Sequence, residues 1–135
     1  MEILFYIYLF CNIFMIGISL ITQFVTYPSF QSINPEIFSN FHKIYAQKML
    51  FIVGPIMTIE FLSVVVLLFI NIDFHFMVQF IFVFLIWILT FFLIVPIHNE
   101  LEKHYDKSLN NKLIKLNGYR TFLWFVKFIF LLIII

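Results

Sequence analysis

Hydrophobic residues form four long runs in this chain, at residues 3–26, 49–70, 76–97 and 119–135. Charged residues are scarce inside these runs: the second contains only Glu60, the third contains none, and the fourth contains Arg120 at its edge and Lys127. A helix needs about 20 apolar residues to cross the hydrocarbon core of a bilayer. The runs lack the alternation that is typical of barrel strands, so they predict membrane-spanning helices.

Local signals predict where these helices begin and end. Asn34-Pro35-Glu36 combines an N-cap residue, a proline at the first helical position and an acid in the first turn, so the second helix should begin before its apolar run. Pro55 removes one hydrogen bond from that helix and predicts a kink near residues 54–55. We expect an all-α, integral membrane, four-helix antiparallel bundle. Its helices should cover residues 3–27, 35–70, 76–109 and 112–135.

The composition agrees with a single transmembrane domain over residues 1–135. Hydrophobic residues make up 64% of the chain and charged residues 11%, whereas about 25% charged residues is usual in a soluble domain. The net charge of +1 gives no reason to expect nucleic acid as a partner. The single cysteine, Cys11, excludes an intramolecular disulfide. The N-terminus does not resemble a cleaved signal peptide, because its apolar run is too long and Glu2 is the only charge near it.

Lysine and arginine residues predict the orientation in the membrane. All but one of the eight lie in or beside the two long connections around residues 28–48 and 98–118, namely Lys43, Lys48, Lys103, Lys107, Lys112, Lys115 and Arg120. The opposite side, formed by residues 1–2 and 71–75, has none. By the positive-inside rule, both long connections face the cytoplasm of a bacterial-type inner membrane and both termini lie outside.

The second long connection also carries an apolar stripe, in which every fourth residue is hydrophobic: Leu101, Tyr105, Leu109 and Leu113. That spacing gives a helix one apolar face, and Lys103, Lys107 and Lys112 lie off it. The pattern predicts a segment that lies on the anionic inner leaflet.

Polar residues inside the runs return to one face of each expected helix. The steps between neighbouring stripe positions bring the side chain back to the same side of an α-helix. The stripes contain Asn12, Ser19, Gln23 and Tyr27; Glu60 and Ser63; Gln79, Ile86 and Thr90; and Asn117, Arg120, Trp124 and Lys127. Four such stripes predict one polar interior.

Glu60 and Lys127 are predicted to form an ion pair in the membrane. They lie on helices that run in the same direction and at similar distances from the outer ends. At about 1.5 Å per residue, their depths differ by roughly 3 Å. Two interpretations remain open: a structural pair that sets the register of two helices, or a proton or substrate site.

A second polar group lies at the cytoplasmic ends of the expected helices. Arginine binds carboxylates and phosphates through two parallel hydrogen bonds, and histidine and asparagine bind metals or polar substrates. No His-x-x-His or Cys-x-x-Cys spacing is present, so we predict no metal site, and the pattern identifies no cofactor. The candidate pocket residues are His42, Tyr45, His98, Asn99, Asn117, Arg120 and Trp124. Among these, His98, Asn117 and Arg120 are expected to converge around one cavity.

The sequence around these positions resembles a group of small four-helix bacterial membrane proteins, the DUF1772 type, which includes anthrone-oxygenase-like proteins. The resemblance lies in the helix layout, in Pro-Ile-His-Asn-Glu-Leu at residues 96–101 and in Asn-Gly-Tyr-Arg-Thr at residues 117–121. It carries over to Asn99, Leu101 and Arg120. It implies a membrane-embedded oxygenase of aromatic polyketide-like substrates, or a relative without assigned activity.

Three functions from different classes remain open. The first is an enzyme or binder of a lipophilic small molecule, with a polar pocket that faces the cytoplasm. The second is a small proton-coupled transporter that uses Glu60. The third is a structural or assembly subunit of a homo-oligomer or larger membrane complex. The sequence contains no conventional nucleophile motif, phosphate loop or Rossmann fingerprint, so it leaves open whether the chain is an enzyme.

The predicted orientation can be tested with a reporter that is active only in the cytoplasm. We expect the reporter to be inactive when fused after Ile135 and active when inserted beside Lys107, because the lysine-rich connections should stay inside. Reporter activity in whole cells is the measurement. An active fusion at Ile135 would contradict the orientation.

Overall fold

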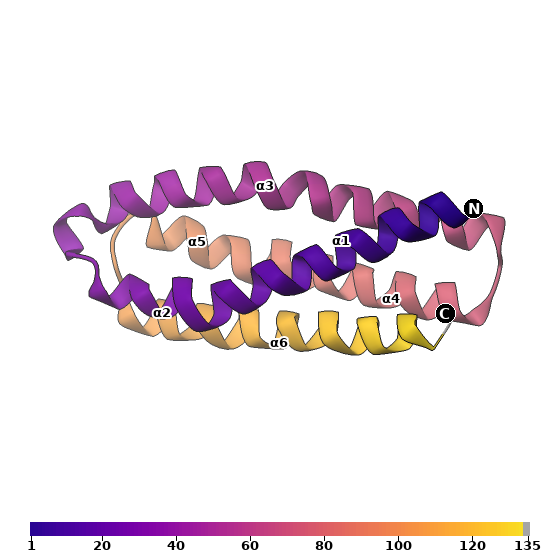
Figure 1. Ribbon diagram of the computed structural model, residues 1–135. Helices are drawn as coiled ribbons and strands as arrows, with labels where there is room; N and C mark the ends of the chain where they lie inside the picture. The colour runs from indigo at the N-terminus through magenta and orange to yellow at the C-terminus, as the bar shows by residue number, and fades with distance from the viewer. Residues whose placement is uncertain (134–135) are drawn as a thin grey trace.

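The computed structural model describes residues 1–133, which form four helical segments that lie side by side (Figure 1). The first segment comprises α1 (Glu2–Ile21), the π-helix η1 (Thr22–Thr26), α2 (Tyr27–Ser29) and the 3₁₀-helix η2 (Phe30–Ser32). The second is α3 (Pro35–Ile70). The third comprises α4 (Phe74–Ile88), the π-helix η3 (Leu89–Ile94) and α5 (Val95–Leu101), and the fourth is α6 (Lys107–Leu132).

Three of these segments are long and apolar enough to cross a membrane: Glu2–Ser32, Pro35–Ile70 and Phe74–Leu101. The sequence predicted four, so the prediction is confirmed for three. α6 is less apolar because it contains lysines in its first half, Arg120 near its middle and Lys127 near its end. The last two residues of the fourth predicted helix, 134–135, lie outside the described part of the chain.

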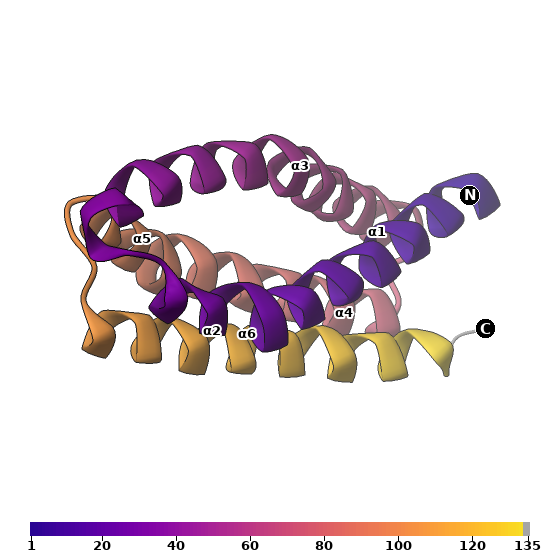
Figure 2. The same ribbon diagram turned by 60° about the vertical axis from the view of Figure 1, so that its left-hand side comes forward.

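The segments follow one another around a closed ring. α1 packs against α3 and α6, α3 packs against α4, and α4 packs against α6. The start of α1 and the end of α6 lie at one end of the molecule, and the connections after η2 and after α5 lie at the other (Figures 1 and 2). The short connection between α3 and α4 keeps these two helices adjacent.

The third predicted helix ends earlier than expected. It stops at Leu101 rather than at residue 109, and a new helix begins at Lys107. Asp106 sets the start of the new helix, because its backbone is extended (φ −134°, ψ 120°) and its side chain accepts a hydrogen bond from the N–H of Leu109 at 2.8 Å. Asp106 is therefore the N-cap of α6.

The predicted apolar stripe at residues 101–113 does not form a surface segment. Its four members pack into a core cluster with Tyr27, Phe30 and Phe38. The first and last, Leu101 and Leu113, are fully buried. The stripe packs against aromatic side chains of the first two segments and not against the membrane leaflet. It therefore closes one end of the molecule.

Two prolines lie directly beyond the π-helical turns. Pro28 follows η1 and Pro96 follows η3. In each case the residue before proline donates its N–H to a threonine carbonyl five residues earlier, Thr22 in η1 and Thr90 in η3. Proline lacks an N–H and its ring clashes with the carbonyl four residues earlier. A single wider turn relieves that clash without ending the helix, which explains why the first segment continues past residue 27.

The predicted kink near residues 54–55 does not interrupt α3, which is α-helical throughout although it contains Pro55. Figure 2 shows that α3 is bowed rather than straight. α3 therefore continues through Pro55, and the kink at residues 54–55 stays a prediction.

The interior is polar along its length, as the four sequence stripes predicted. All four segments contribute buried polar side chains: Asn12, Ser19, Thr22, His42, Glu60, Ser63, Gln79, Thr90, Asn110, Asn117, Arg120, Thr121 and Lys127. Large apolar side chains are exposed on the outside of the same segments. Apolar clusters and polar side chains therefore share the interior, while the outside of the segments is more apolar than is usual for a soluble domain.

The cap at Asp106 yields a stability prediction. Asp106→Ala should lower the free energy of unfolding by about 0.5–2 kcal/mol, because the N–H of Leu109 loses its acceptor, whereas Asp106→Asn should lose much less. Asp73 precedes α4 as N-cap but makes no side-chain cap hydrogen bond, so Asp73→Ala is the matched control. Thermal unfolding followed by circular dichroism is the measurement. Equal losses in the two alanine variants would contradict the assignment.

Candidate functional site

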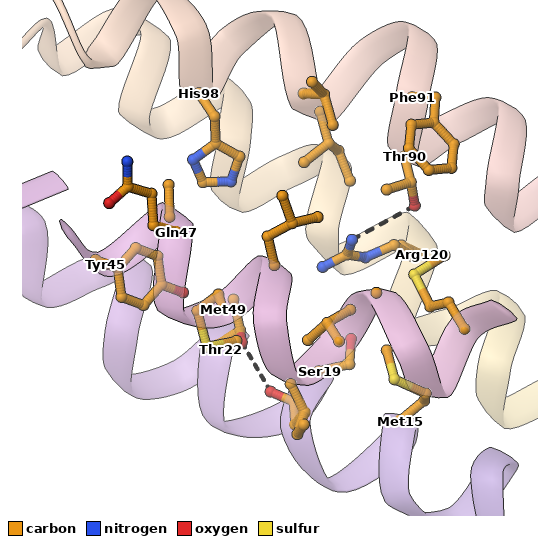
Figure 3. A pocket seen from close by; sticks show the side chains of 18 of the residues that line it. Met15, Ser19, Thr22, Tyr45, Gln47, Met49, Thr90, Phe91, His98 and Arg120 are labelled. Atoms are coloured by element: carbon orange, nitrogen blue, oxygen red, sulfur yellow. Dashed lines mark hydrogen bonds between the residues drawn. The ribbon is translucent and has the colours of Figure 1, made fainter. Parts of the chain in front are cut away.

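A cavity of about 460 Å³ lies between the helical segments (Figure 3). Its walls come from all four segments, with α6 contributing Arg120. The apolar part of the wall includes Met15, Ile18, Met49, Leu50, Val53, Met57, Trp87, Phe91 and Ile94. The polar part includes Ser19, Thr22, Tyr27, Tyr45, Thr90, His98, Asn99 and Arg120.

Both π-helical turns border this cavity. Thr22 of η1 lines it, and so do Thr90, Phe91 and Ile94 of η3. π-Helical turns are rare and occur frequently at functional sites. The two proline-linked turns thus shape the cavity wall on two different segments.

Arg120 extends into the cavity from α6, and only 8% of its surface is exposed. Its Nη1 donates to the Thr90 hydroxyl at 3.4 Å, its Nη2 donates to Asn117 Oδ1 at 2.7 Å, and its Nε is buried without a partner. The Trp124 ring lies against the guanidinium, 5.5 Å from Cζ to the ring centroid. None of the ion pairs within residues 1–133 includes Arg120.

Asn117 does not line the cavity, which corrects the prediction that it converges there with His98 and Arg120. Its Oδ1 accepts from Arg120, and its Nδ2 donates to Gln23 Oε1 at 2.8 Å. The amide of Asn117 therefore faces α1, because Gln23 and the Ser19 carbonyl attract its N–H groups. Asn117 therefore holds the guanidinium of Arg120 in position from outside the cavity wall.

A chain of three hydrogen-bonded side chains ends at the cavity. His42 Nε2 lies 2.8 Å from His98 Nδ1, and His98 Nε2 lies 2.9 Å from the Tyr27 hydroxyl. Tyr27 and His98 line the cavity, whereas His42 is fully buried behind them. A ring nitrogen can donate or accept according to its tautomer. The chain can therefore pass a proton between the cavity and His42.

The remaining predicted pocket residues divide into two groups. Tyr45 and Asn99 line the cavity. Trp124 lies behind Arg120, and its Nε1–H donates to Glu60 Oε2 at 3.4 Å. The structure thus brings four of the predicted residues to the wall and the other three, His42, Asn117 and Trp124, into contact with residues on or beside it.

Several cavity residues were not among the predicted pocket residues. Tyr27 and Thr90 were on the polar stripes but were not assigned to the pocket. Thr22 lies one position off the predicted stripe, at the first position of η1. A sequence signal for Thr22 and Thr90 was available. Each is a threonine six residues before a proline, in the pairs Thr22–Pro28 and Thr90–Pro96.

Glu60 and Lys127 meet in the interior, away from the cavity wall. Lys127 Nζ donates to Glu60 Oε1, and both side chains are almost fully buried. Tyr8 lies beside them, with its ring centroid 5.1 Å from Lys127 Nζ. Its hydroxyl donates to Gln79 Oε1 at 2.8 Å, and Gln79 Nε2 donates to the Lys127 carbonyl at 3.0 Å. The pair therefore joins a closed network that links all four segments.

Comparisons with known proteins found no matching family model, curated protein or solved structure. Within residues 1–133, no group of three or more His, Cys, Asp or Glu side chains could hold a metal ion. The function must therefore be argued from the cavity and its side chains.

The ion pair gives a prediction on stability. Glu60→Gln and Lys127→Met should each lower the free energy of unfolding by about 3–5 kcal/mol, because each leaves a buried charge without its partner. The double variant should lose less than the sum of both. Unfolding in mild detergent is the measurement. Strictly additive losses would show that the two charges do not stabilise each other.

The exposed pair between Lys103 and Glu100, at 2.8 Å, provides the matched control. Glu100→Gln and Lys103→Met should each cost no more than about 1 kcal/mol, because water screens an exposed pair. A loss as large as that at Glu60 would mean that burial is not the cause.

Proposed function

We propose that this chain is an integral membrane protein of four spans that binds a lipophilic small molecule in the cavity between its helices. The cavity of about 460 Å³, with mostly apolar walls and a few polar groups, is the observation that carries the proposal. Small-molecule sites commonly have volumes of about 300–1,000 Å³ and combine apolar walls with a few well-placed polar groups.

The outer surface supports insertion in a bilayer. Large apolar side chains are exposed on every segment, for example Phe24, Phe51, Phe92 and Phe122. Soluble monomers rarely expose contiguous apolar patches of this extent. α6 is proposed as the fourth span because the exposed side chains of its second half are apolar, while Arg120 and Lys127 are buried between the helices.

The cavity is proposed to face the cytoplasm. His98, Asn99 and Tyr45 line its part near the two connections, where Lys103 and Lys107 are exposed. The positive-inside rule favours a cytoplasmic location for these lysines. A ligand could then enter from the inner leaflet or from the cytoplasm.

The two other functions have less support. A proton-coupled transporter would need Glu60 to reach water, whereas Glu60 is fully buried, bonded to Lys127 and absent from the cavity wall. A purely structural role would not explain the cavity or the unpaired Nε of Arg120. The Glu60–Lys127 pair is better suited to hold α3 and α6 in register.

An enzymatic role would use the hydrogen-bonded chain of His42, His98 and Tyr27. Because the last two line the cavity, they could exchange a proton with a bound molecule. The resemblance of residues 96–101 and 117–121 to DUF1772-type proteins favours an enzyme that acts on lipophilic aromatic molecules. Binding is the part of this proposal that the cavity supports directly.

Filling the cavity should remove the ligand. Gly54 lines the cavity, and a Cβ added there would meet only Leu50 Cδ1 at 3.6 Å, so the backbone has room for a side chain and Gly54→Leu should fill part of the cavity. Gly17→Leu is the matched control, because it makes the same change at a helical glycine with nothing within 4 Å of the added Cβ. Organic extraction of each purified protein, followed by mass spectrometry, is the measurement.

We expect a lipophilic molecule to accompany the wild type and Gly17→Leu, and to be depleted about tenfold or more from Gly54→Leu, equivalent to about 1.4 kcal/mol of binding free energy. The same extract would reveal a bound quinone or haem. Equal recovery from all three proteins, or recovery from none, would contradict the proposal.

A further inference from the structure

We infer that the ligand carries an anionic oxygen group, a carboxylate or a phosphate, and that Arg120 binds this group. The inference rests on the proposed function, because it identifies the class of molecule that the same cavity takes. It is carried by the charge and the hydrogen-bond donors of Arg120.

Lys127 and Arg120, which are both buried between the helices, differ in their ion-pair partners. Lys127 has Glu60 as its ion-pair partner, and the pair is closed off from the cavity. Arg120 has no carboxylate partner within residues 1–133, yet it is almost fully buried. A buried charge without a partner is strongly unfavourable, and arginine remains protonated in proteins. The cavity is the place from which a compensating anion can approach.

The hydrogen bonds of Arg120 lead to the same conclusion. A guanidinium has five N–H donors, and among residues 1–133 Thr90 and Asn117 accept two of those of Arg120. The Thr90 contact is long, 3.4 Å, and Nε is buried without any partner. Figure 3 shows the guanidinium extending into the cavity beside Thr90. A carboxylate or phosphate can accept two parallel N–H groups from such a fork, which a neutral carbonyl cannot do with equal strength.

The residues that line the cavity indicate the polarity of the rest of the ligand. Met15, Met57 and Trp87 line the cavity together with aliphatic residues, so the body of the ligand should be apolar. Methionine side chains adapt to irregular shapes. Glu102 also lines the cavity, from the connection after α5, and its carboxylate would repel an anionic group placed near it. The acidic head should therefore lie at Arg120, with the apolar body along the walls.

The two tryptophans of the chain provide the readout. Trp87 lines the cavity, and Trp124 contacts Arg120. A bromine atom quenches tryptophan fluorescence at short range, so the probes are ω-bromoundecanoate, ω-bromoundecanol and ω-bromoundecylammonium. They are titrated into the delipidated full-length protein at constant detergent concentration.

We expect saturable quenching, with the acid binding about tenfold or more tightly than the alcohol, equivalent to about 1.4 kcal/mol, and the ammonium probe binding most weakly. Gly54→Leu should abolish saturation. Equal affinities for acid and alcohol would overturn the inference and leave the proposed function standing. No saturable quenching by any probe would overturn both. These outcomes need no variant of Arg120.

Variants of Arg120 then test the residue itself. Arg120→Gln should lower the affinity for the acid to that for the alcohol, and Arg120→Lys should give an intermediate value, because lysine keeps the charge but lacks the planar fork. Lys115→Gln, which removes an exposed cation from the same helix, should leave the order of affinities unchanged. An acid preference that persists in folded Arg120→Gln would overturn the assignment.

Competition separates the sources of the anionic group. Undecyl phosphate should displace bound ω-bromoundecanoate, whereas inorganic phosphate at the same concentration should not. Displacement by inorganic phosphate would show that the site takes a free anion and would overturn the assignment to an amphiphile.

Discussion

Polar groups buried in this protein can meet partners only between the helices, because large apolar side chains cover most of the outside of the segments. A polar group left unpaired in such surroundings is costly, and an unpaired charge more so. The network around Glu60 and Lys127 satisfies this constraint by joining side chains from all four segments. Its bonds act between helices rather than within them, so the network determines which faces meet. The bonds of Glu60 to α6 and of Tyr8 to Gln79 cross between segments that are not neighbours in the ring, so they hold the bundle together across its middle.

Arg120 differs from Lys127 because it has no ion-pair partner within residues 1–133, and this difference points to function. The protein neutralises Lys127 but surrounds Arg120 with neutral acceptors and the face of Trp124. Asn117 and Trp124 hold the guanidinium in position without cancelling its charge. Such an arrangement is suited to a binding site, where the ligand supplies the missing charge. The histidine chain lies at the same cavity, so binding and proton transfer could take place on one molecule.

The cavity also depends on local helix geometry. Pro28 and Pro96 each follow a π-helical turn, and both turns contribute lining residues. Thr22 and Thr90, whose carbonyls accept the wide hydrogen bonds of these turns, both line the cavity. Proline thus influences the site through the backbone, although neither proline lines it.

The sequence by itself determined the helices, their polar faces and the ion pair. Apolar length predicts helices, and the period of 3.6 residues sets the side of the helix on which each polar residue lies. Glu60 and Lys127 could be paired because rise per residue converts position into depth. Only the tertiary structure decided the partners of each face: the amide of Asn117 is directed toward Gln23, and Leu101 and Leu113 pack in a core cluster with Phe38. The sequence predicted a cavity near His98 and Arg120, but its volume and most of its wall could not be predicted, because they depend on the separation of helices whose contacts lie far apart in the chain.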